Sequence, residues 1–416
     1  MLLSIKRWLP LLSQFLGGQA LVQVINLCTA LLLLRLLPID EYALFVIASF
    51  YLSIGSVGSD LNLSTALSTF GARISNDRVK LSGLFALIAT LRRKLFIVMV
   101  LIIVALTPYM VKSHAWQMEQ IFILLIPIII SIWFQQKLTL RTMVLNIQHD
   151  STGLFQTGLT GALVRMLLTY TLCTIWPFAI VAVLGALVSF FCAGWLAKRR
   201  CVPYLNENTP ANHSYDGQVK NFIYPLLPAA VYFTFQGQIS IFLISIFGSS
   251  NAIAEVGALT RFAQIFAFLG VLNGFFFQPV FSRINDKKEF IRKLLLVTGL
   301  LTLGLGLILF SAWLVPDWWL LLLGSNYAGL QSEVLLAVAG PVASYFYGFF
   351  FTLLAARAFT QGQYWYVLVT LIVQVIFIAL IGVDTTHKAL ELNLMNSLAT
   401  MFVEIALLFV LIRKWQ

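Results

Sequence analysis

Charged residues are scarce in this chain. Only 10% of its 416 residues are Asp, Glu, Lys or Arg, whereas 60% are hydrophobic and the mean hydropathy is +0.91. A soluble protein of this length would carry roughly 25% charged residues. The longest polar segment, at about 198–220, is too short to bury a core of its own. Apolar runs of about 20 residues recur instead, long enough to cross a bilayer, and they predict an all-α polytopic membrane protein.

Sequence motifs for nucleotide, metal or disulfide chemistry are missing as well. The chain has no G-x-x-x-x-G-K-[ST] phosphate loop, no H-E-x-x-H helix and no paired C-x-x-C motif. Its four histidines fall at or near expected loops. No disulfide framework is apparent among the four cysteines, Cys28, Cys173, Cys192 and Cys201. We therefore expect neither an enzyme nor an ATP-driven pump, and no cofactor or metal.

Basic residues outnumber acidic residues, with a formal net charge of +11. Their placement favours a topological role over a nucleic-acid partner. When the loops between apolar runs are assigned alternately to two sides, nearly all loop Lys and Arg residues share one side. Only Lys112 and Lys388 fall on the other. Because cytoplasmic loops carry such an excess, the pattern places both termini in the cytoplasm.

The apolar runs are bounded by turn-forming stretches such as "LLPIDEY" and "VPDWW". With these turn-forming stretches as boundaries, the sequence predicts twelve transmembrane helices. They are expected at residues 15–36, 42–64, 94–111, 120–138, 153–175, 177–197, 219–247, 254–280, 291–315, 329–356, 363–382 and 389–412.

A short basic loop occurs twice, half a chain apart. "ARISNDRVK" follows the second expected span and "SRINDKKEF" follows the eighth, while Glu41 and Glu255 open those two spans. Matches at similar offsets indicate a duplication into two six-helix lobes, which in such transporters enclose a substrate site. The expected divisions are an N-terminal lobe at 1–205, a cytoplasmic linker at 206–217 and a C-terminal lobe at 218–416.

Three stretches resemble polysaccharide-exporting flippases. They are "LLLRLLPIDEYALF", "ALTRFAQ" and "LLLLGSNYAGLQSEVLLAVAG". The chain is similar to the Wzx-type O-antigen and polysaccharide flippases, within the superfamily that also holds multidrug exporters and the peptidoglycan-precursor flippase. This resemblance implies movement of an undecaprenyl-pyrophosphate-linked oligosaccharide across a bacterial inner membrane. It also implies membrane lipids, a polysaccharide polymerase and chain-length machinery as partners.

Ionisable side chains at membrane depth are costly and point to function. Arg165 lies near the middle of the fifth expected span, and Arg261 lies within the eighth, with Gln264 about one helical turn further on. A guanidinium suits a phosphate because it stays charged and offers paired donors. Arg165 and Arg261 are therefore candidates for a cationic cavity, with structural hydrogen bonding as the alternative. Arg35, near a span end, is expected to reach the interface, with the cavity as its alternative.

Polar stripes on other expected spans are candidates for a wet cavity. Gln23 and Asn26 belong to such a stripe on the first span, and Gln236 lies on the seventh. The twelfth carries Asn393, Asn396, Thr400 and Glu404 on one face. Glu404 is the candidate for proton or cation coupling. Hydrogen bonding between helices, worth about 0.6 kcal/mol on average, explains the amides equally well.

The sequence favours a two-lobe flippase that works by alternating access, and leaves two alternatives. A multidrug exporter of the same fold would favour carboxylates in the cavity, because most such drugs are cations, whereas arginines predominate here. A membrane-embedded polysaccharide transferase or polymerase would need a sizeable outer loop for its catalytic groups, and the expected outer loops are short.

Overall fold

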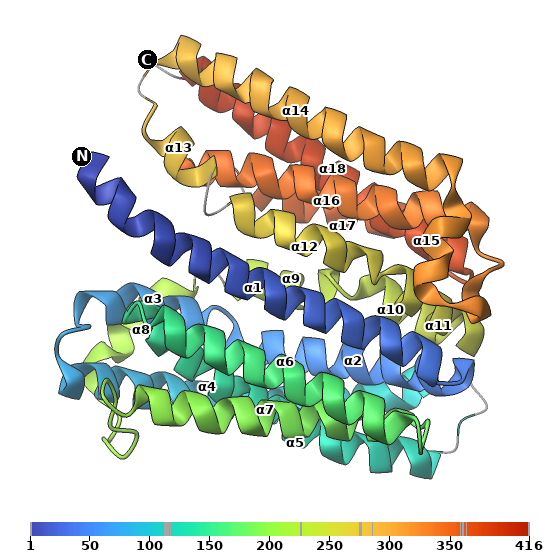
Figure 1. Ribbon diagram of the computed structural model, residues 1–416, viewed down its shortest axis with the longest axis horizontal. Helices are drawn as coiled ribbons and strands as arrows, with labels where there is room; N and C mark the ends of the chain where they lie inside the picture. Colours follow the sequence, from blue (N-terminus) through green and yellow to red (C-terminus); the bar gives the residue numbers. More distant parts are fainter. Residues whose placement is uncertain are drawn as a thin grey trace. The chain divides into compact units, whose positions relative to one another are not determined.

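The computed structural model describes residues 2–111, 116, 118–224, 227–273, 277–284, 286–357, 359, 362 and 364–414. Every regular element in these ranges is a helix (Figure 1). The chain divides into two compact units, Met1–Ile246 and Phe247–Gln416. The boundaries expected from the sequence at 205 and 218 stay a prediction. Lys112, expected on the outer side, lies outside the described residues.

The N-terminal unit consists mainly of long helices joined by short turns. Its helical segments are α1 (Leu2–Leu36), α2 (Ile39–Asp60), α3 (Leu63–Arg73), α4 (Arg78–Val111), α5 (Met118–Ile147), α6 (Ser151–Cys173), α7 (Ala179–Cys201), η1 (His213–Tyr215), α8 (Asp216–Ile223), α9 (Leu227–Gln236) and, at the unit boundary, α10 (Ile239–Phe247).

The C-terminal unit combines three long helices with several short ones. Its helical segments are α11 (Ser250–Leu259), α12 (Phe262–Leu272), α13 (Gln278–Ser282), α14 (Lys287–Leu314), α15 (Pro316–Leu323), η4 (Ser325–Tyr327), α16 (Gln331–Ala356), α17 (Tyr364–Leu380) and α18 (Thr386–Lys414). Within this unit, α16 packs along α18, and α17 packs on the same partner.

Ten of the twelve expected spans coincide with one helix or with two consecutive helices, whereas those at 219–247 and 254–280 each overlap three shorter helices of the described residues. Among the described residues, seven helices are long and apolar enough to cross a membrane by themselves: α1, α2, α5, α7, α14, α16 and α18. The pair α9 and α10, bent by 53°, would make an eighth span. The all-α fold predicted from the sequence is therefore confirmed.

Helix α2 forms the buried centre of the N-terminal unit. Most of its apolar side chains are almost fully enclosed, with Phe50 at 1% and Ile54 at 0% exposure. The helix packs against α4 and α5. A Cβ atom at Gly55 would collide with Ile132 of α5, and one at Gly58 would collide with Met99 of α4. Both glycines therefore set how closely the three helices approach.

Helices α4 and α5 extend beyond the spans expected from hydropathy. The first turns of α4 and the last turns of α5 join α3 and α8 in a small hydrophobic core, centred on Leu67, Leu84, Val144 and Val219. The rings of Phe222 on α8 and Phe70 on α3 are 5.6 Å apart. We call this part of the unit its basic end, because the loop "ARISNDRVK" lies there.

The residues after α7 are bonded to this basic end. Glu207 binds Arg141 of α5 through both carboxylate oxygens, at 2.7 and 3.0 Å. Arg78 donates to the carbonyl of Val202 at 2.7 Å, and the backbone amide of Asn212 donates to the carbonyl of Gly83 at 3.1 Å. The start of the expected linker is therefore held against α4 and α5.

The repeated basic loops have the same local function in the two units. Asp77 accepts a hydrogen bond from the backbone amide of Lys80 at 3.1 Å, and Asp286 accepts one from the amide of Glu289 at 2.9 Å. Each aspartate therefore caps the helix that follows, α4 or α14. The bond from the Lys80 amide also lowers the pKa of the Asp77 carboxyl. Helix capping explains why both loops carry an aspartate here.

The two glutamates that open the second and eighth spans are equivalent as well. Glu41 accepts a bond from the backbone amide of Ala179, the first residue of α7, at 2.7 Å. Glu255 accepts one from the hydroxyl of Thr386, the first residue of α18. In each unit a carboxylate thus holds the start of the sixth helix of the repeat. These paired contacts support the duplication inferred from the sequence.

The predicted orientation is open to direct labelling. In a variant without the four native cysteines, a cysteine at Ser325 is expected to react with an impermeant maleimide added outside intact cells. A cysteine at Asn76 is expected to react only after the membrane is opened. Both side chains are exposed, so accessibility depends on the side of the membrane. Outside labelling of Asn76 would contradict the orientation.

Candidate functional site

The polar residues predicted on α1 and α6 lie on two helices that pack together. Gln23 and Asn26 of α1 and Arg165 of α6 are each half-buried. Helix α1 packs along α6. The three side chains therefore belong to one helix pair of the N-terminal unit.

Close packing fixes the register of that pair. A Cβ atom at Gly18 would meet the ring of Phe155, and one at Gly158 would lie 3.6 Å from Val22. The two helices thus run in the same direction, and a residue of α1 faces the residue of α6 whose number is about 136 higher. This register places Arg165 at the level of position 29, within about one helical turn of Asn26. An arginine and an amide therefore lie at similar depth.

Arg35 lies in the last turn of α1 and is exposed, as expected for a side chain that reaches the interface. Gln236 is half-buried at the last position of α9, directly before the bend that separates α9 from α10. A bend of 53° interrupts the helical hydrogen-bond pattern there. Gln236 therefore lies at a break within the segment 219–247, which the sequence predicts to be one continuous helix.

Arg261 lies at a second interruption, between α11 and α12. Its backbone amide donates to the carbonyl of Ala258 at 3.0 Å, and its carbonyl accepts from Gln264 at 3.0 Å. These three-residue spacings are tighter than those of an α-helix. The side chains of Arg261 and Gln264 are both half-buried. In transporters, interrupted helices commonly line substrate and ion sites.

Glu404 is enclosed in the C-terminal unit, with 2% exposure. It lies on the polar face of α18, within electrostatic reach of Tyr347 on α16. One helical turn earlier, Thr400 is buried and bonds to the carbonyl of Asn396. Helices α16 and α18 are also joined by a hydrogen bond of 2.8 Å between the hydroxyls of Ser344 and Ser397. Glu404 therefore lies among polar side chains at the interface between the long helices α16 and α18.

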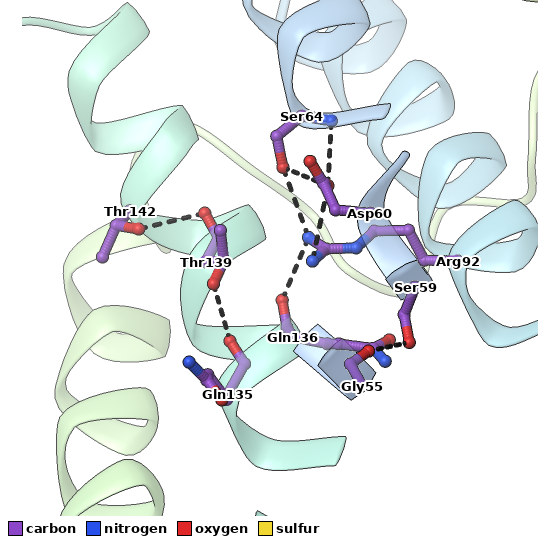
Figure 2. Close-up of polar contacts among 9 residues, drawn as sticks. All are labelled: Gly55, Ser59, Asp60, Ser64, Arg92, Gln135, Gln136, Thr139 and Thr142. Atoms are coloured by element: carbon purple, nitrogen blue, oxygen red, sulfur yellow. Dashed lines mark hydrogen bonds and ion pairs between the residues drawn. The ribbon is translucent and has the colours of Figure 1, made fainter. Parts of the chain in front are cut away.

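Sequence analysis missed a buried polar cluster in the N-terminal unit (Figure 2). Arg92 of α4 is 1% exposed and lies 3.4 Å from the carboxylate of Asp60, the last residue of α2. Its guanidinium also donates to the Ser64 hydroxyl at 3.4 Å and to the Gln136 carbonyl at 3.3 Å. Residues of α2, α3 and α5 thus converge on one arginine of α4.

Asp60 also closes the turn between α2 and α3. Leu61 and Asn62 have positive φ angles of 38° and 67°, a conformation that is unusual for non-glycine residues. Asp60 accepts bonds from the Ser64 amide at 3.1 Å and the Ser64 hydroxyl at 2.6 Å. Backbone strain of this kind often marks functional or switching segments.

The sequence assigned Arg92 to a basic loop as a topological signal, whereas the structure buries it. Arg92 and Arg93 are adjacent, yet helical geometry turns the first inward and leaves the second exposed. The available signal was Asp60, a carboxylate inside an expected span in the stretch "GSVGSDLNLS". A lone acidic residue there requires a partner.

The fold is similar to those of solved membrane transporters. An inward-facing MATE-family multidrug resistance transporter of the MOP superfamily matches with a TM-score of 0.70 and 12% identity, covering 94% of each chain. The lipid II flippase MurJ, in an inward closed conformation, matches with a TM-score of 0.69 and 12% identity, covering 95% of this chain and 87% of that one.

A eukaryotic MATE transporter matches with a TM-score of 0.67 and 14% identity, covering 97% of this chain and 95% of the other. No protein-family model and no curated relative matches the sequence. The two-lobe, MATE- and MurJ-like fold implied by the resemblance is therefore confirmed.

Proposed function

We propose that this chain is a flippase that moves a polyprenyl-pyrophosphate-linked oligosaccharide across the membrane by alternating access. The observation that carries the proposal is a pair of half-buried arginines, Arg165 in the N-terminal unit and Arg261 in the C-terminal unit, each within a span expected from the sequence. A pyrophosphate group that leaves water loses several kcal/mol of solvation. Arginines offset that loss through charge and paired hydrogen bonds, while the sugars occupy the polar interior.

The fold supports a transport function, and one of its structural neighbours is a flippase for lipid II. The likeness to Wzx-type sequences favours an undecaprenyl carrier and an O-antigen or other surface polysaccharide unit. It also favours the bacterial inner membrane, cytoplasmic termini, and a polymerase and chain-length machinery downstream. We place Gln23, Asn26, Gln236 and Gln264 along the sugar path.

Deletion of the gene tests this function in cells. Loss of the flippase is expected to abolish surface glycan and to cause the lipid-linked precursor to accumulate, because later steps act on the opposite leaflet. Re-expression of the chain should reverse both effects. Unchanged surface glycan together with increased sensitivity to cationic drugs would contradict the proposal.

A multidrug exporter is the second candidate function. It is favoured by the buried carboxylate of Glu404 and by the multidrug transporter among the neighbours. A transferase or polymerase is disfavoured because most of the described connections at the predicted outer ends are short. Examples are residues 37–38 between α1 and α2 and residues 248–249 between α10 and α11.

We propose that Glu404 couples transport to a proton or cation. Glu404→Gln keeps the size and hydrogen-bonding capacity of the side chain but removes its negative charge. Transport is expected to fall about tenfold, because a charge-assisted interaction of about 1.5 kcal/mol would be lost. The measurement is transport at several pH values and sodium concentrations, with protein levels matched.

The control is Glu391→Gln, the same change on the same helix where the side chain is 37% exposed. This variant should retain transport. Full activity of Glu404→Gln under every condition would remove the coupling role.

A further inference from the structure

An exposed face of α4, α5 and α7 carries a second cationic cluster, separate from the arginines proposed to line the transport path. Lys137 of α5 lies 4.5 Å from the ring centroid of Trp133, and the Arg93 guanidinium of α4 lies 5.6 Å from the same ring. On α7, the Arg199 guanidinium lies 3.6 Å above the ring of Trp195. We call these residues, together with Lys198, the lateral cation cluster.

The two tryptophan-centred groups form one patch. The rings of Phe134 on α5 and Phe191 on α7 are 5.3 Å apart, and Arg141 of α5 donates to the Gly194 carbonyl of α7 at 2.9 Å. Lys137 lies within electrostatic reach of both Arg93 and Lys198. Cations from three neighbouring helices therefore share one place on the surface.

The positive charge of this cluster is not neutralised by the protein. Across the described parts of the chain, Arg93, Lys137, Lys198 and Arg199 form no ion pair with a carboxylate. The acidic group that acts on Lys137 is Glu207, and both of its oxygens are already bonded to Arg141. Like charges held together repel one another, so the arrangement is suited to an external anion.

The exposed surface next to the cluster is apolar. On each helix, an exposed stripe leads away from the cations at helical spacing: Ile97, Leu101 and Val104 on α4, Ile130, Ile126 and Ile123 on α5, and Phe191, Val188 and Leu184 on α7. The cations coincide with the span ends expected at 94, 138 and 197. Acyl chains and headgroup would therefore meet matching surfaces.

We propose that the lateral cation cluster binds the headgroup phosphate of an anionic phospholipid, with the acyl chains along the three stripes. Basic side chains at a membrane interface attract anionic headgroups, and tryptophan rings settle at the same depth. Cation–π contacts hold Arg93, Lys137 and Arg199 in place. A bilayer phospholipid fits this site because most of the cluster is exposed and the cluster adjoins three exposed apolar stripes.

The test is binding of phosphatidylglycerol to the purified full-length chain in neutral detergent, measured by native mass spectrometry. In Arg93→Gln/Lys137→Gln/Arg199→Gln, affinity is expected to fall at least tenfold. The matched control, Arg283→Gln/Lys288→Gln/Arg292→Gln, removes three exposed charges from the C-terminal unit and should change affinity less than twofold. Lys137→Gln alone should give a smaller loss, which keeps the test available if the triple variant folds poorly.

Two further ligands identify the source of the phosphate. Glycerol phosphate, which lacks acyl chains, and a polyprenyl pyrophosphate should both bind the cluster more weakly than phosphatidylglycerol. Tighter binding of either at the cluster would overturn the assignment to a bilayer phospholipid. Equal phosphatidylglycerol affinity in wild type and triple variant, or an equal loss in the control, would overturn the site itself.

Discussion

Surface-glycan export is expected to fall about tenfold or more when either Arg165 or Arg261 is replaced by alanine. In the proposed mechanism, each arginine offers a charge and paired donors to the pyrophosphate, and hydrogen bonds to a charged group are each worth about 1.5–3 kcal/mol. Because the two arginines are proposed to share this role, loss of either should remove only part of the binding. The measurement is surface glycan in a deletion strain complemented with each variant, at matched protein levels.

The series of substitutions separates charge from geometry. Lysine should retain part of the export at both positions, because it keeps the charge but loses the fork-shaped pair of donors. Glutamate should be the most damaging. Arg292→Ala, at an exposed position of α14, serves as the control and should export normally. Wild-type export by both alanine variants would contradict the cationic-cavity mechanism, whereas loss of the protein from the membrane would indicate a structural role.

Breaking the buried pair of Asp60 and Arg92 is expected to give the largest loss of stability. Arg92→Leu leaves the Asp60 carboxylate facing an apolar side chain, and removal of one partner from a buried pair costs about 3–5 kcal/mol. Asp60→Asn should also destabilise, because it leaves the buried Arg92 guanidinium without a carboxylate partner, although the amide oxygen can still accept a hydrogen bond from Ser64. Thermal unfolding in detergent measures both effects.

The double variant Asp60→Asn/Arg92→Leu tests the interaction directly. Replacing both partners removes the uncompensated charge, so stability should recover part of what Arg92→Leu loses. Arg93→Gln is the matched control: it lies one residue away, is exposed, and should change stability by about 0.5 kcal/mol or less. If Arg92→Leu and the control are equally stable, the buried pair does not stabilise the N-terminal unit.

The long helices could be predicted from the sequence because bilayer thickness imposes their length and composition. Apolar runs of about 20 residues predicted the long helices, and seven helices of the described residues are long and apolar enough to cross a membrane by themselves. The repeated basic loops proved to be equivalent helix caps at Asp77 and Asp286. These features depend on local sequence, which a single chain displays fully.

The helix interruptions could not be predicted in the same way. The break at Thr260–Arg261 contains neither glycine nor proline, so it depends on tertiary packing. Burial of Arg92 was missed for a related reason: hydropathy averages over all sides of a helix, whereas Arg92 and Arg93 face opposite environments. Gln236 and Arg261 were selected as polar residues in apolar runs, and their position at breaks emerged only from the structure.

The most direct test of the central claim is reconstitution of the purified chain into liposomes. A fluorescent oligosaccharide on a polyprenyl pyrophosphate is placed in one leaflet, and its arrival in the other is measured by quenching. We predict that this lipid is translocated and that the same glycan on a polyprenyl monophosphate moves much more slowly. In the double variant Arg165→Ala/Arg261→Ala, the two lipids should move at the same rate. Rapid transport of a cationic dye, with no movement of the pyrophosphate lipid, would contradict the account.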